Sequence, residues 1–146
     1  MKKRLPRFFN CPSEFTLEVL GGKWKTVILC FIKEGPCRYH EIRRLAPSLS
    51  EKMLTERLKD LLNAGLITRC KEKEGGTRDV YALTERGESL HQILSCLYSW
   101  GRQHADEFGV RIGNPLALLD EVRPQRTLVK SPRSPDSATH ISERSR

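Results

Sequence analysis

Residues 45–65 read LAPSLSEKMLTERLKDLLNAG, and this stretch decides the fold. Ser50 is suited to cap the amino end of a helix, and Glu51 places a negative charge in its first turn. Gly65 provides the left-handed residue with which many helices end. Between them, leucines recur at helical spacing on one face: Leu54, Leu58, Leu61 and Leu62. The stretch therefore predicts an amphipathic helix from Ser50 to Ala64.

The opposite face of this helix is polar. It consists of Lys52, Glu56, Lys59 and Asn63, with Thr55 at its edge. A helix that presents long polar side chains outward fits the major groove of duplex DNA, although an ordinary surface helix shows the same pattern. The neighbouring segments decide between these two interpretations.

A shorter helix is predicted immediately before it, over the sequence RYHEIRRLA from Arg38 to Ala46. Its inward side is formed by Tyr39, Ile42 and Leu45. Only residues 47–50 join the two helices, and Pro47 ends the first of them. Two helices joined by so short a turn, the second amphipathic, are typical of a helix-turn-helix unit. A plain αα-hairpin is the alternative.

A β-hairpin is predicted directly after this unit. Residues 66–70 and 79–83 are strand candidates, and Gly75-Gly76 between them is a turn signal. A hairpin in this place is a wing. Its tip is charged, with Glu72 and Glu74 among the basic residues Lys71, Lys73 and Arg78. A solvated loop is the alternative, but the position after the polar helix favours contact with nucleic acid.

Further helices are predicted before the helix-turn-helix and after the hairpin. Cys11-Pro12 opens one that Gly21-Gly22 ends, and a second, from Lys23 to Ile32, has an apolar stripe of Trp24, Val27, Ile28 and Phe31. Thr84 caps a long helix from Glu85 to about Phe108. Its apolar residues recur at helical spacing: Leu90, Ile93, Leu94, Leu97 and Trp100. Because this exceeds what a small core needs, part of it is predicted to pair with a second subunit, with internal packing as the alternative.

Charge is concentrated at the two ends of the chain. The 146 residues suit one domain, and their formal net charge is +8 at pH 7. Residues 1–10 carry four basic residues and no acid, and residues 123–146 carry six against two acids. The region between, 11–122, holds equal numbers of basic and acidic residues. A nucleic-acid function therefore depends on basic groups that gather on one face, and not on the overall charge.

Several classes of protein are disfavoured by composition. The five cysteines form no CxxC pair and the four histidines stand apart from them, so no zinc site and no cofactor are predicted. Free thiols fit the reducing cytoplasm. No apolar run is long enough to span a membrane, and the start of the chain lacks a secretory signal. No nucleophile–base pair or acidic dyad is readable, so an enzyme is not predicted.

Five segments in this order carry a resemblance to a known family. They are CPSEFTLEVLGGKWKTVIL at 11–29, RYHEIRRL at 38–45, LSEKMLTERLKDLLNAGLITR at 49–69, RDVYALTERG at 78–87, and Trp100-Gly101. Together they strongly resemble the HxlR-type winged helix-turn-helix transcriptional regulators over residues 11–105. One departure is that Gly76-Thr77 stand where the family's wing usually has a proline pair before its arginine.

The resemblance implies a mostly α fold with a small β-hairpin, a winged helix-turn-helix with dimerisation helices at both ends. It implies a dimeric regulator that binds short inverted repeats of double-stranded DNA. A small-molecule effector is a further candidate partner, but the sequence does not identify one. The folded domain is expected over 11–110, after a basic arm at 1–10. Residues 111–146 lie outside the resemblance, and their composition predicts a mostly disordered basic tail with one short turn from Asn114-Pro115 to Val122. A winged helix used for protein contacts is the alternative function, supported by the neutral middle of the chain.

The candidate site residues follow from these placements. Lys52, Thr55, Glu56 and Lys59 are expected to reach base edges or flanking phosphates, and the carboxylate of Glu56 can accept from cytosine N4. Basic residues around them are expected at the backbone or minor groove: Arg43, Arg44, Lys71, Lys73 and Arg78. Dimerisation is expected to involve Leu94, Leu97 and Trp100.

The cysteine of the CP motif is the remaining candidate, since some members of the family use it to sense electrophiles or oxidants. Cys11 stands at a helix amino end behind Arg4 and Arg7, and both features should lower its pKa. Simple packing of that helix end is the alternative. Cys37 shares some of this advantage. The other thiols are predicted to be unactivated: Cys30 and Cys96 on or beside buried faces, and Cys70 in a strand.

Overall fold

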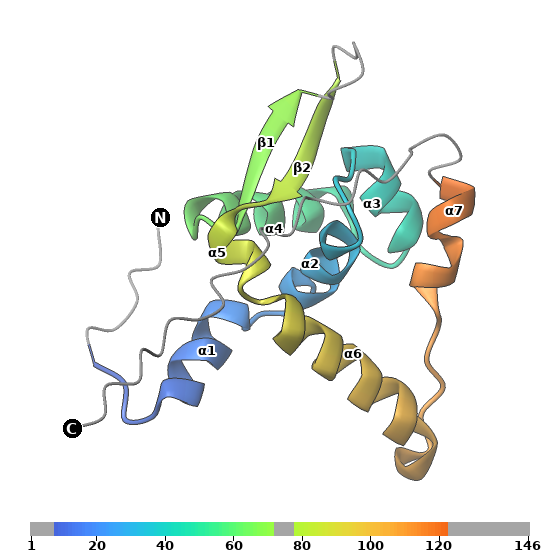
Figure 1. Ribbon diagram of the computed structural model, residues 1–146. Coiled ribbons are helices and arrows are strands. Elements are labelled where there is room, and N and C mark those ends of the chain that lie inside the picture. The colour runs from blue at the N-terminus through green and yellow to red at the C-terminus, as the bar shows by residue number, and fades with distance from the viewer. Residues whose placement is uncertain (1–7, 72–77, 123–146) are drawn as a thin grey trace, which may run out of the picture.

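The computed structural model describes residues 8–71 and 78–122 (Figure 1). Most of the basic arm, the wing tip with Lys73, and residues 123–146 of the tail lie outside the described residues. The elements in chain order are α1 Pro12–Leu20, α2 Lys25–Lys33, α3 Tyr39–Leu45, α4 Glu51–Asn63, β1 Ile67–Lys71, β2 Asp79–Leu83, α5 Glu85–Glu88, α6 His91–His104, η1 Ala105–Phe108, η2 Pro115–Leu118 and α7 Leu119–Val122. The predicted mostly α fold with one hairpin is confirmed.

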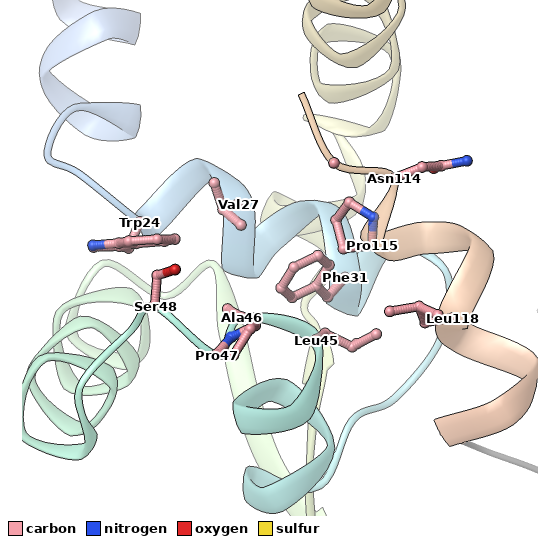
Figure 2. Close-up of a pocket in the computed structure, with 11 residues that line it drawn as sticks. Trp24, Val27, Phe31, Leu45, Ala46, Pro47, Ser48, Asn114, Pro115 and Leu118 are labelled. Atoms are coloured by element: carbon pink, nitrogen blue, oxygen red, sulfur yellow. The ribbon is translucent and has the colours of Figure 1, made fainter. Parts of the chain in front are cut away.

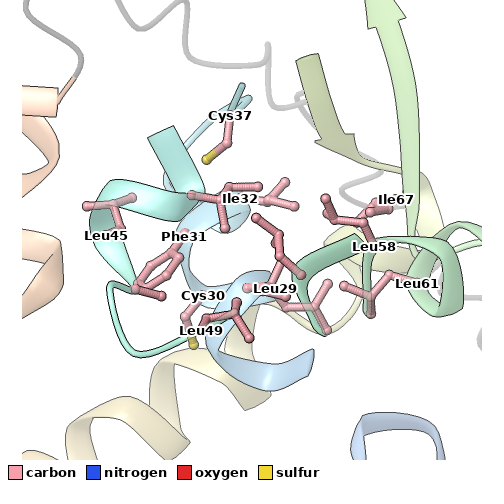
Figure 3. Close-up of a cluster of buried hydrophobic side chains, with 14 of the residues drawn as sticks. Leu29, Cys30, Phe31, Ile32, Cys37, Leu45, Leu49, Leu58, Leu61 and Ile67 are labelled. Carbon is pink, nitrogen blue, oxygen red and sulfur yellow. The ribbon is translucent and has the colours of Figure 1, made fainter. Parts of the chain in front are cut away.

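The core is built around α2, which contacts α3, α4, α6 and β2. Because it has neighbours on several sides, α2 is buried almost all round, at Ile28, Leu29, Cys30, Phe31 and Ile32. Figure 3 shows Leu29, Phe31 and Ile32 in one cluster with Leu45 of α3 and with Leu58 and Leu61 of α4. Ile28 and Phe31 of the stripe predicted for this helix are buried, and Trp24 packs against the core from the N-cap position, but Val27 is 37% exposed.

The helix-turn-helix forms as predicted. Leu54, Leu58 and Leu61 of α4 are buried in the core, and Leu62 is half-buried beside them. The Ser50 hydroxyl accepts a hydrogen bond from the Met53 backbone N–H at 3.2 Å, which satisfies one donor at the amino end of α4. At the other end Gly65 has a φ of 67°, the left-handed conformation that ends the helix. These local signals place α4 at the bounds predicted from the sequence.

The wing is anchored to the end of α4. β1 and β2 pair antiparallel with Ile67 opposite Leu83 and Lys71 opposite Asp79. The Thr84 hydroxyl donates to the Gly65 carbonyl at 2.6 Å and accepts from the Gly87 backbone N–H at 3.1 Å. A Cβ at Gly87 would lie only 2.1 Å from the Leu66 carbonyl oxygen, so the backbones meet closely here. The orientation of the hairpin relative to α4 is thereby fixed.

The long helix predicted from Glu85 to Phe108 is wrong in one respect, because it breaks in two. α5 ends at Glu88, and α6 begins at His91. At the junction the Leu90 backbone N–H donates to the Gly87 carbonyl at 3.0 Å, a tighter turn than the α-helical one. The close packing of Gly87 on Leu66 holds α5 against the hairpin, and the turn redirects the chain so that α6 packs on α2.

The fold extends beyond residue 110. The short turn predicted after Asn114 is present as η2 and α7, and both contact α3. Val122 is buried in this contact, and Leu116 and Leu119 pack against the core. The Tyr98 hydroxyl of α6 also lies 2.6 Å from the Asn114 Oδ1. Residues 114–122 therefore belong to the folded domain. None of the described helices has the length and apolar character needed to cross a membrane.

Candidate nucleic-acid interface

The outward face of α4 carries the predicted base-reading residues. Lys52, Thr55, Glu56 and Lys59 are all exposed; Lys52, Glu56 and Lys59 lie opposite the buried leucines, and Thr55 lies at the edge of this face. The Tyr39 hydroxyl of α3 donates to the Glu51 carbonyl at 3.2 Å and lies 3.3 Å from the Thr55 Oγ1. Tyr39 packs against the core, as predicted, but its contact with Thr55 could not be predicted from the sequence, because it depends on how α3 crosses α4.

Arg43 and Arg44 have different environments, although they are adjacent in sequence. The Arg43 guanidinium donates to the Leu49 carbonyl and lies 4.0 Å from the Glu51 carboxylate. It is therefore engaged within the protomer, where it braces the turn between α3 and α4. The side chain of Arg44 is exposed. Of the two predicted phosphate contacts, Arg44 is the one whose charge is presented to solvent.

The base of the wing gathers charge around one carboxylate. The Lys71 Nζ lies 2.8 Å from the Asp79 Oδ1, and Arg69 pairs with the same side chain. Hydrogen bonds from Lys71 and then from Arg69 lower the pKa of Asp79. Arg78, next to this cluster, is exposed. Arg69 was missed from the sequence, although the two-residue period of a strand places it on the same face as Lys71.

The apolar face of α6 divides between core and solvent. Leu94 is fully buried against the core, so its assignment to a subunit interface is wrong: it is already covered within the chain. Leu97 and Trp100 are 49% and 59% exposed, and Ile93 and Phe108 continue the exposed surface. On α1, Phe15 and Leu17 are also exposed. Figure 1 shows α1 and α6 projecting from the same end of the molecule.

Cys11 stands at the amino end of α1 and is exposed. Its Sγ lies 2.8 Å from the Ser13 Oγ. The pKa of the Cys11 thiol is lowered, first by the Ser13 hydroxyl and then by the backbone N–H groups of Ser13 and Glu14. The lowered pKa of Cys11 agrees with the prediction. Arg4 and Arg7, which were expected to contribute to it, lie outside the described residues.

Two of the other cysteine predictions are wrong. Cys37, expected to share some of the advantage of Cys11, is completely buried, and its backbone pairs with Tyr81 of β2. Cys96, predicted on or beside a buried face, is exposed on α6. Cys30 is buried as predicted, and burial raises the pKa of its thiol.

A groove of about 580 Å³ lies beside the turn of the helix-turn-helix (Figure 2). Its walls come from α2, from the α3–α4 turn and from the segment that leads into η2, and include Trp24, Val27, Phe31, Leu45, Pro47, Ser48, Pro115 and Leu118. Because these segments are far apart in the chain, the groove could not be predicted from the sequence. Among residues 8–71 and 78–122, no group of His, Cys, Asp and Glu side chains could hold a metal ion.

Comparison with known proteins decides the family. A model described as HxlR-like helix-turn-helix matches residues 19–108. The chain belongs to this family. It is 40% identical over 113 residues to the uncharacterised HTH-type transcriptional regulator YtcD of Bacillus subtilis, an alignment that covers 77% of this chain and 87% of YtcD. The family places the chain among transcriptional regulators with a DNA-binding helix-turn-helix, as the resemblance implied.

Two solved structures extend this comparison. The redox regulator HypR in its reduced form superposes with a TM-score of 0.61 at 35% identity, covering 68% of this HxlR-type chain and 98% of HypR. The reduced transcriptional regulator YodB of B. subtilis superposes with a TM-score of 0.55 at 33% identity, covering 65% of this chain and 94% of YodB. YodB is also known in quinone-bound and diamide-treated structures.

Proposed function

We propose that the protein is a sequence-specific DNA-binding transcriptional regulator that acts in the cytoplasm as a homodimer on inverted-repeat operators. The observation that carries this proposal is the orientation of α4. Three buried leucines fix the helix to the core, so that Lys52, Glu56 and Lys59 face away from the protein, with Thr55 at the edge of this exposed face. A rigid helix with an exposed polar face is what reading base edges in the major groove requires. Membership of a regulator family supports the proposal.

Each side chain has a role that follows from its position. Lys52, Thr55, Glu56 and Lys59 on α4 would read base edges or contact flanking phosphates. The wing would follow the backbone or the adjacent minor groove through Arg78 and Lys71, and through Lys73 beyond the described residues. Arg69 would add to this charge. Arg44 would contact a phosphate beside α3, and Arg43 would reach one only by leaving its contacts at the turn.

A dimer would place two copies of α4 on two half-sites. Leu97, Trp100 and Ile93 of α6, together with Phe15 and Leu17 of α1, leave a large apolar surface exposed in the protomer. Such a surface is characteristic of a subunit interface. A two-fold dimer reads an inverted repeat, with half-sites roughly 34–36 Å apart for one helical turn of DNA.

Regulation through Cys11 is the second element of the proposal. An exposed thiol with a lowered pKa reacts faster with electrophiles and oxidants than an ordinary one. Its helix carries part of the surface proposed for dimerisation, so modification would change the distance between the two copies of α4. The redox character named for HypR supports this element. A small-molecule effector would have a place in the groove of Figure 2, where it would touch the α3–α4 turn.

The experiment is selection of binding sites from random duplex DNA, followed by affinity measurements at several salt concentrations. Enrichment of an inverted repeat, with affinity that falls steeply with salt, is the expected result. A winged helix used for protein contacts would bind all sequences weakly and enrich none. Diamide or a quinone should weaken binding by the wild type but not by the Cys11→Ser variant. Equal loss in both proteins, or loss in neither, would exclude Cys11 as the switch.

A further inference from the structure

Tyr39 and Thr55 form a hydroxyl pair between the two helices of the helix-turn-helix. Tyr39 is the first residue of α3, and its ring is half-buried against the core. Its hydroxyl reaches α4, where it lies 3.2 Å from the Glu51 carbonyl oxygen and 3.3 Å from the Thr55 Oγ1. Thr55 is exposed at the edge of the polar face of α4. The pair thus joins a residue packed in the fold to one proposed to read DNA.

The direction of both hydrogen bonds follows from valence. A carbonyl oxygen can only accept, so the single proton of the Tyr39 hydroxyl goes to Glu51. The bond between the two hydroxyls then needs the proton of Thr55, with the Tyr39 oxygen as acceptor. Thr55 is left with lone pairs and no free proton. Its oxygen can therefore accept a hydrogen bond from DNA but cannot donate one.

We propose that Tyr39 is a specificity-determining residue, which sets Thr55 as a hydrogen-bond acceptor for an amino group of adenine or cytosine. In the major groove, adenine N6 and cytosine N4 present donors, whereas guanine N7 and O6 and thymine O4 present acceptors. A threonine hydroxyl that is free to rotate can donate to a base acceptor or accept from a base donor. A hydroxyl whose proton is already used can only accept, so it distinguishes adenine and cytosine from guanine and thymine. This inference rests on the proposed DNA-binding function.

Thr55 differs in this respect from the other candidates on α4. Lys52, Glu56 and Lys59 carry their charges at the ends of long side chains with several rotatable bonds. The hydroxyl of Thr55 sits directly on Cβ, and χ1 of a β-branched residue has few settings in a helix. The contact with Tyr39 selects one χ1 rotamer of Thr55 before DNA binds. Tyr39 itself does not need to touch DNA, and it is a positioning residue.

The test is site selection with the full chain, comparing the wild type with Tyr39→Phe. The phenylalanine keeps the ring in the core and removes only the hydroxyl, which frees the Thr55 proton. The wild type should prefer adenine or cytosine at one position of each half-site, by about three- to tenfold over guanine or thymine, as a single hydrogen bond allows. In Tyr39→Phe this preference should vanish at that position alone. Affinity for random DNA and the melting temperature should stay close to those of the wild type.

Two further variants separate this role from simple packing. Tyr98→Phe removes a tyrosine hydroxyl that is hydrogen-bonded to Asn114 on the other side of the fold, and it should leave the preference intact. In a Thr55→Val background, Tyr39→Phe should have no further effect on base preference, because the hydroxyl it orients is gone.

Three results would overturn the inference. One is an unchanged base preference in Tyr39→Phe when the wild type is selective, which leaves the proposed function standing. The second is a loss of affinity in Tyr39→Phe that is equal for all sequences, which shows that Tyr39 only holds α3 and α4 together. The third is a wild type that selects no sequence, which overturns the inference together with the proposed function.

Discussion

Two helices of similar length, α4 and α6, carry apolar residues at the same helical spacing but use them differently. In α4 the leucine stripe is buried and the polar face is exposed. In α6 only Leu94 is fully buried, while Leu97 and Trp100 face solvent. α4 packs on both α2 and β1, whereas the described contact of α6 with the core is through α2. The spacing of apolar residues shows which face of a helix is suited to burial. The neighbouring elements decide whether that face is covered within the chain or left exposed.

The difference implies two kinds of partner. A helix that gives its apolar side to the core and keeps polar groups outside suits a charged, hydrogen-bonding ligand such as DNA. A helix that keeps apolar groups outside suits another apolar surface, and a second copy of the chain supplies one. The following variants test this contrast, beginning with the one expected to have the largest effect.

A charge on the outward face of α6 should have the largest effect. Leu97→Glu would place a carboxylate in the proposed interface, where its desolvation is costly, and should convert the dimer into monomers. Sedimentation velocity measures this directly. Because Leu97 is half-exposed in the protomer, the variant should keep the circular dichroism of the wild type. Ser99→Glu, an exposed position on another face of α6, is the matched control and should remain dimeric. A folded Leu97→Glu dimer would place the interface elsewhere.

Removing a leucine from α4 should lower stability within the protomer. Leu58→Ala deletes a buried side chain and should reduce the free energy of unfolding by about 2–5 kcal/mol, whatever the protein concentration. Leu97→Ala on α6 is the comparison, and its smaller effect should depend on protein concentration, because it acts through the dimer. Urea unfolding at two concentrations measures both. A similar, concentration-independent loss in the two variants would remove the distinction between the helices.

Within the DNA-binding surface, the wing and α4 should respond differently to truncation. Arg78→Ala should weaken binding to all sequences alike and reduce the salt slope by about one unit, as the loss of a phosphate contact does. Thr55→Ala should instead alter base preference at one position. Arg102→Ala, an exposed arginine on α6, should change neither property. Equal losses of specificity from Arg78→Ala and Thr55→Ala would contradict this division.

The smallest expected effect is at the amino end of α1. The Ser13 hydroxyl is the main cause of the lowered pKa of Cys11, so Ser13→Ala should raise that pKa. At neutral pH the thiolate fraction would fall, and alkylation of Cys11 by iodoacetamide would slow. Cys70, an exposed thiol in β1, should be unaffected and serves as the internal control in mass spectrometry. No change at Cys11 would show that Ser13 does not activate it.

The parts of the fold predicted from sequence are those fixed by local interactions. The Ser50 and Thr84 caps, the left-handed Gly65 and the leucine period of α4 each depend on residues within a few positions in the chain. The same holds for the strands of the hairpin. These signals, with their order in the chain, were sufficient for the fold class and for the placement of Lys52, Thr55, Glu56 and Lys59 on an exposed face.

The features that only the tertiary structure decided depend on contacts between segments that are far apart in the chain. The break between α5 and α6 follows from the close approach of Gly87 to Leu66, which no helical periodicity registers. Leu94 and Leu97 differ in burial because Leu94 packs into the core cluster and Leu97 does not. The contact of Tyr39 with Thr55 arises because a short turn brings two helices together at one angle. Sequence determined which residues could form each face, and packing determined which of those faces remained open to a partner.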